Sequence, residues 1–215
     1  MPLQTTQPAP RHLVSSDNPC PFLRALVADG TLADGTEPLA RIATILVETA
    51  RQGEGAPSLP KTGICIIALS ANGMSLSKML QSYRHGVQLN ALRNGPYDKQ
   101  GAGSRILDAA GEVDLNELKR MGDFATEKTM SGGAKEPGLS LTQLKAFMDA
   151  NFERAAGRRR RIDRLVMNGE WPILLKVLGK DGIEGRYLSL ADVTLLFKEM
   201  RLPGRMTGHS FPAAQ

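Results

Sequence analysis

Cys20 is the residue whose surroundings point most directly to chemistry, because it stands between two prolines in Pro19-Cys20-Pro21. Pro21 suits the first position of a helix, which places Cys20 at the N-cap. The sulfur then faces the unpaired N–H groups of Phe22 and Leu23 and the positive end of the helix dipole. This predicts a pKa below the free value of about 8.5 and a thiolate able to ligate haem iron. The alternative is that the motif only starts a helix, with Cys20 as a small buried apolar residue.

Glu170 is the second candidate, at the head of an apolar run that begins with Trp171 and ends at Gly179. A carboxyl group in apolar surroundings has a raised pKa and can move protons. The alternative is a functionally silent carboxylate at a helix N-terminus, with Pro172 at a tolerated early position.

The stretch from Pro19 to Leu32, with Gly169-Glu170, Gly179-Lys-Asp-Gly and Arg201-Leu202-Pro203 in that order, resembles the haem-thiolate peroxidases, the family of chloroperoxidases and peroxygenases. The resemblance implies haem b with Cys20 as its axial ligand, Pro19 and Pro21 beside it, and Glu170 as the distal acid–base group. It also implies that hydrogen peroxide is used to oxygenate or halogenate a small organic substrate. The alternative function is a non-catalytic haem carrier or sensor.

Two departures from the family pattern concern a distal arginine and a second metal. The family's arginine lies on the face of the glutamate, whereas Arg164 is six residues upstream of Glu170 and off that face. We keep Arg164 as a catalytic candidate. The family's acidic triplet, which holds magnesium or manganese, is altered here. Asp123, Glu127 and Ser131 remain as oxygen donors for such an ion, or form only a solvated charged turn.

The segments that must position these residues are predicted to be helices. Apolar spacing predicts a helix after Cys20 that closes at Asp29-Gly30, and a second over about Pro38 to Arg51. Several later helices begin with a capping residue, followed in two cases by a Glu or Gln that completes a capping box. These capping residues are Ser75, Asp114, Ser140 and Ser189. No hairpin of alternating strands stands out, so we expect an all-α fold of the chloroperoxidase type around a haem. We expect one domain over 19–205, an irregular arm over 1–18 and a tail over 206–215.

The composition limits the partners. The chain has 215 residues, 41% of them hydrophobic, and no apolar stretch long enough to span a bilayer. With no signal peptide evident, we expect a cytoplasmic protein with no membrane partner. The net charge of +5 comes with few aromatic residues, so we expect no nucleic-acid binding. The run Arg158 to Arg161 is either a solvated face or a contact for an anionic partner, as in a haem-free interaction module. The oligomeric state is left open.

Overall fold

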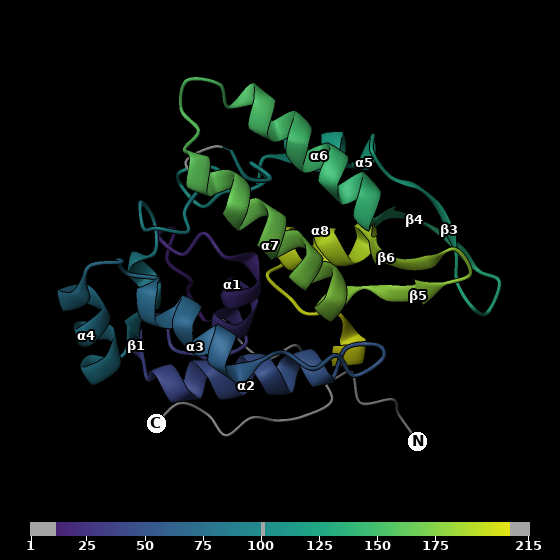
Figure 1. Cartoon of the computed structure of the whole chain (residues 1–215). Helices are drawn as coiled ribbons and strands as arrows, with labels where there is room; N and C mark the ends of the chain where they lie inside the picture. The colour runs from purple at the N-terminus through teal and green to yellow at the C-terminus, as the bar shows by residue number, and fades with distance from the viewer. Residues whose placement is uncertain (1–11, 100–101, 207–215) are drawn as a thin grey trace, which may run out of the picture.

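The computed structural model describes residues 12–99 and 102–206, in which eight α-helices and six strands are formed (Figure 1). The helices are α1 Pro21–Ala28, α2 Leu39–Arg51, α3 Lys61–Ser70, α4 Leu76–His85, α5 Leu115–Gly122, α6 Leu141–Arg154, α7 Arg161–Leu178 and α8 Leu190–Lys198, with 3-10 turns at Leu89–Ala91 and Gly204–Met206. The strands are β1 Thr36–Glu37, β2 Val87–Gln88, β3 Thr126–Thr129, β4 Lys135–Ser140, β5 Lys180–Gly182 and β6 Gly185–Ser189.

The expectation of an all-α fold was wrong, because two antiparallel sheets are present. One joins β1 to β2, and the other has the strand order β3-β4-β6-β5. The segment around Ser131 to Gly138 is rich in Gly and polar residues, which suggests a loop, but it belongs to a hairpin. Its strands contain Pro137 and Gly138 and few β-branched residues, so local propensity does not reveal them.

The larger sheet is built from two similar units, each a β-hairpin followed by a helix. The hairpin β3-β4 leads into α6, and the hairpin β5-β6 leads into α8. The second strands of the two hairpins pair with each other, with Leu139 opposite Leu188. Ser140 and Ser189, two of the expected capping residues, therefore stand at the two strand-to-helix junctions.

A buried polar network holds the two hairpins together. The Glu136 carboxylate of β4 accepts hydrogen bonds from Lys180 Nζ at 2.8 Å, Tyr187 Oη at 2.8 Å and Ser189 Oγ at 2.9 Å. Burial opposes the charged form of Glu136, but the three donors hold its pKa below the usual value. This network joins residues about fifty positions apart, which is why the sheet depends on the tertiary fold.

Helix α7 crosses the middle of the molecule (Figure 1), and its buried residues form part of the apolar core. It begins at Arg161, so Glu170 lies in its middle and the expectation of a helix N-terminus there was wrong. Pro172 stands inside the helix, where it lacks an N–H to donate. Trp171 is buried and meets the edge of Phe147 at 6.4 Å between ring centroids.

The first two helices match their expected ranges. α1 follows its N-cap Cys20 with Pro21 at the start, and α2 begins after Pro38 and ends at Arg51. The segment 12–18, expected to be an irregular arm, lies without regular secondary structure against the fold, because Asn18 is buried and Ser15 N–H bonds Asp34 at 2.9 Å. The rest of that arm and nearly all of the expected tail lie outside the described residues.

Candidate functional site

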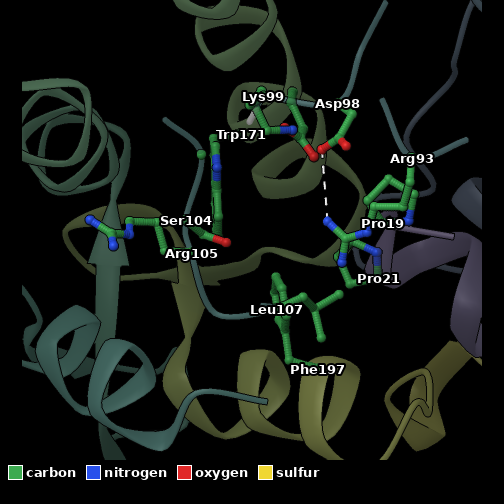
Figure 2. Close-up of a pocket in the computed structure, with 12 residues that line it drawn as sticks. Pro19, Pro21, Arg93, Asp98, Lys99, Ser104, Arg105, Leu107, Trp171 and Phe197 are labelled. Atoms are coloured by element: carbon green, nitrogen blue, oxygen red, sulfur yellow. Dashed lines mark hydrogen bonds and ion pairs between the residues drawn. The ribbon is translucent and has the colours of Figure 1, made fainter. Parts of the chain in front are cut away.

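A polar hollow lies where the start of α1, the segment 93–107 and α7 meet (Figure 2). Trp171, Leu107 and Phe197 supply its apolar walls, and Pro19 and Pro21 line it on either side of Cys20 in the chain. Charged residues also line it, among them Arg93, Asp98, Lys99 and Glu170. The structure therefore brings the neighbours of Cys20 and the carboxylate of Glu170, about 150 positions apart in the chain, to one site.

Cys20 lies at the N-cap of α1 as expected, but the expected lowering of its pKa was wrong. Burial is the largest influence and raises the pKa of the thiol above 9.0. The Leu23 and Phe22 N–H groups act in the opposite direction, although the sulfur forms no regular capping hydrogen bond. The dipole and amides of a short helix thus compensate only part of the cost of desolvating a thiolate.

Glu170 is held by Lys99, whose ammonium forms an ion pair and a hydrogen bond with its carboxylate. Both side chains are largely buried. Burial works against the charged Lys99, but Glu170 and, more weakly, Cys20 hold the pKa of Lys99 above its usual value. Lys99 is therefore charged at neutral pH, and Glu170 is its ion-pair partner in this conformation.

Cys20, Lys99 and Glu170 form one electrostatic unit. Glu170 raises the pKa of the Cys20 thiol and Lys99 lowers it, each acting through space. Lys99 was not among the residues singled out from the sequence. It stands in a glycine-rich segment that resembles a linker, and no local pattern marks it as a partner of Glu170.

Arg93 is a second cation at the hollow, and no pattern in the sequence singles it out. It ion-pairs with Asp98 at 3.7 Å and donates to the backbone oxygen atoms of Ser16 and Asp108. Arg105 also lines the hollow, but its guanidinium is directed away, toward Glu117 at 4.0 Å (Figure 2). Arg93 and Lys99 are thus the basic groups available to an anionic ligand here.

Arg164, the catalytic candidate upstream of Glu170, lies elsewhere. It forms an ion pair with Asp149 at 2.8 Å and its guanidinium covers the ring of Phe152 at 5.0 Å. It does not line the hollow. Within the basic run, the buried Asp163 accepts from the Arg160 backbone N–H at 2.7 Å and pairs with the Arg160 guanidinium at 2.7 Å, and Arg159 pairs with Glu153 at 3.0 Å. These contacts favour a structural reading of that run.

The three oxygen donors of the candidate magnesium or manganese site lie on different elements of the described structure. Asp123 ends α5, whereas Glu127 is on β3 and pairs with Lys135 at 2.7 Å. Ser131 lies in the turn after β3 and donates to the Asp181 carbonyl at 3.3 Å. No group of three or more His, Cys, Asp or Glu side chains suited to a metal ion occurs among residues 12–99 and 102–206.

The donor set at the hollow fits a haem in its chemistry. It offers a carboxyl group, two cations for propionates, and aromatic and aliphatic walls, and the Cys20 thiol lies between two prolines that line it. The hollow itself measures about 70 Å³. Pockets for drug-sized ligands are about 300–1,000 Å³, so the hollow in this conformation is too small for a porphyrin.

The comparisons with known proteins add no relative. No family model matches the chain, and neither a curated protein nor a solved structure matches it. No described helix has the length and apolar character needed to cross a membrane.

Proposed function

We propose that this chain is a haem-thiolate peroxidase or peroxygenase that uses hydrogen peroxide to oxidise a small organic substrate. The observation that carries the proposal is the through-space electrostatic interaction of Cys20 with Glu170, beside a hollow that Pro19, Pro21 and Glu170 line. The motif resemblance assigns the ligand and the acid–base group to Cys20 and Glu170. Their electrostatic coupling is a consequence of the tertiary fold and does not follow from either motif alone.

Cys20 would bind the iron through its sulfur. Metal coordination removes the thiol proton even where burial disfavours the free thiolate. The Leu23 and Phe22 N–H groups favour the negative sulfur. When bound, a thiolate-ligated haem supplies an iron centre with the electron density that favours O–O cleavage.

Glu170 would move a proton between the two oxygen atoms of the peroxide. For this the carboxylate must be released from Lys99, because a carboxylate held in an ion pair is a weaker base. Outward movement of Lys99 would also make room for the cofactor. Arg93 would remain at the rim as a cation for a propionate, and Trp171 with Phe197 would exclude water from the apolar side.

The test is the spectrum of the full chain after haem addition, reduction and exposure to carbon monoxide. A thiolate ligand gives a Soret band shifted to the red relative to a histidine ligand. We expect this shifted band in the native chain and in Cys65→Ala, the matched control, and its loss in Cys20→Ala. Absence of haem binding, or an unchanged band in Cys20→Ala, would contradict the proposal.

The second candidate is a haem carrier or sensor, and the Lys99–Glu170 ion pair favours it because that pair occupies the proposed base. Peroxide-dependent oxidation of a phenol by native chain and by Glu170→Gln separates the two. Loss of activity in Glu170→Gln supports the enzyme. Haem binding without activity in either protein supports the carrier.

A further inference from the structure

Helix α4 buries a serine and leaves three apolar residues of one face, Leu76, Leu80 and Tyr83, exposed. Ser82 is 2% exposed and is the buried residue of this helix, whereas Leu76 is 84% and Tyr83 is 71% exposed. Apolar residues of a surface helix normally face the core. The arrangement is therefore the reverse of what the stability of this helix alone would favour.

Helix α3 repeats the reversal. Its Ser70 is buried and its hydroxyl lies 2.6 Å from Tyr97 Oη, whereas Ile66 and Ile67 are 58% and 49% exposed. Met74, in the turn to α4, and Leu80 on α4 are exposed as well. We call α3, this turn and α4 (residues 61–85) the α3–α4 hairpin. Exposed apolar residues gathered on packed helices mark a contact site more often than scattered ones do.

The charge of the α3–α4 hairpin has one sign. The chain contains no Asp or Glu from position 55 to position 97, but it contains Lys61, Lys78 and Arg84 on the hairpin, all exposed. None of the three forms an ion pair with another described residue, and Lys61 donates only to Thr44 Oγ1 at 3.0 Å. The cations are free to meet an external anion.

The shape of this region favours a broad surface over an inserted helix as the partner. α4 lies at the outer edge of the molecule and packs chiefly against α3 and β2 (Figure 1). The hollow beside α4 measures about 40 Å³ and is lined by polar residues, among them Asn72, Lys78 and His85. A small polar hollow offers no seat for the apolar face of a partner helix.

We propose that the α3–α4 hairpin docks on the surface of an anionic lipid bilayer. Leu76, Leu80 and Tyr83, which share one face of α4, would enter the headgroup region, and Lys61 and Arg84 would meet lipid phosphates and carboxylates. Basic residues flanking exposed apolar ones are typical of interfacial membrane contacts. The expectation of no membrane partner rested on the lack of a spanning segment, and contact with one leaflet needs none. A second copy of the chain fits less well, because it would bring like charges together.

The experiment is sedimentation of the full chain with vesicles of phosphatidylcholine, with and without phosphatidylserine. We expect binding only where phosphatidylserine is present and weakening with added salt. Arg84→Gln should lower the affinity about fivefold. Leu76→Gln should lower it at least as much. Because these side chains are exposed, the variants should fold, which thermal unfolding would verify.

The matched controls are Lys145→Gln on α6 and Leu165→Gln on α7, which are exposed residues outside the hairpin and should leave binding unchanged. Three outcomes would overturn the proposal. They are no sedimentation with either vesicle, an equal loss in controls and hairpin variants, and a dimer in ultracentrifugation that Leu76→Gln abolishes while the vesicles bind nothing.

Discussion

At the scale of single residues, the protonation of Cys20 depends on two neighbours of opposite charge. Glu170→Gln should lower the pKa of the thiol, because a negative charge is removed, and Lys99→Met should raise it, because a positive charge is removed. The measurement is the alkylation rate of Cys20 against pH, in a Cys65→Ser background so that one thiol reports.

The control for this pair of variants is Lys119→Met, which removes an exposed cation from α5 and should leave the alkylation profile unchanged. A shift of both profiles in the same direction would show that the substitutions act through exposure of Cys20. Charge would then not be the cause.

Glu117 is the residue whose titration should affect stability most clearly. Hydrogen bonds from Arg154, at 2.7 and 2.9 Å, and from Arg120 at 2.9 Å hold its pKa at about 2 against an ordinary 4.5. A lowered folded-state pKa stabilises the fold above about pH 4.5, and this stabilisation is lost as the pH falls toward 2.

Glu117→Gln should therefore lower the free energy of unfolding by about 2 kcal/mol at pH 7 and by much less near pH 2. Urea unfolding of both proteins at the two pH values measures the difference. Glu48→Gln, an exposed glutamate on α2, is the control and should cost less than about 0.5 kcal/mol at either pH. A cost for Glu117→Gln that is equal at both pH values would contradict the assignment.

At the scale of elements, two serines that look alike in the sequence have different roles. Ser140 completes a capping box with Gln143, whose side chain accepts from Ser140 N–H at 2.8 Å. Ser189 makes no cap, and its hydroxyl donates to Glu136 instead. Ser75 and Asp114 accept from backbone N–H groups as predicted, although Glu117 does not reach back and pairs with arginines.

Substitution by aspartate should separate the two serines. Ser140→Asp should keep nearly full stability, because Asp is as good an N-cap as Ser. Ser189→Asp should cost more than about 2 kcal/mol, because it buries a second carboxylate beside Glu136. Urea unfolding measures both, and equal costs would contradict the distinction.

These elements also show how far the sequence alone can predict the fold. Helices α1 and α2 and the caps at Ser75 and Ser140 follow from local signals, because capping and helical spacing act within a few residues. The strands do not, since they depend on Glu136 and its distant donors. Cys20 and Glu170 could be singled out because local sequence motifs mark them. Lys99 could not, because its role depends on a partner that is distant in the sequence.

Gly138 on β4 shows why the hairpin strands look unlike strands in the sequence. A Cβ at this position would lie 2.4 Å from Cδ2 of the buried Tyr187 ring. Gly138→Ala should therefore cost about 1–3 kcal/mol in urea unfolding. At Gly132, in the β3–β4 turn, a Cβ would meet nothing within 4 Å, so Gly132→Ala should cost less than about 0.5 kcal/mol. A smaller cost at Gly138 would mean that Tyr187 can move.

At the scale of the whole molecule, the candidate site joins three parts of the chain that have little else in common. The start of α1 supplies Cys20, the segment between the 3-10 turn at Leu89–Ala91 and α5 supplies Lys99, and the middle of α7 supplies Glu170. Ser70 on α3 contacts Tyr97 in the same segment as Lys99, so the α3–α4 hairpin is linked to the wall of the hollow. Movement of that segment would affect both.

If haem binds at the hollow, it should stabilise the folded chain as a whole. A ligand at a hundred times its dissociation constant adds about 2.7 kcal/mol, which in a domain of this size raises Tm by about 5 to 10 °C. Thermal unfolding with added haem measures this shift. Cys20→Ala should lose most of the shift, because the iron loses its ligand, whereas Leu76→Gln on the α3–α4 hairpin should retain it. An equal shift in Cys20→Ala would mean that haem adsorbs to exposed apolar residues, and its loss in Leu76→Gln would identify the hairpin as the place.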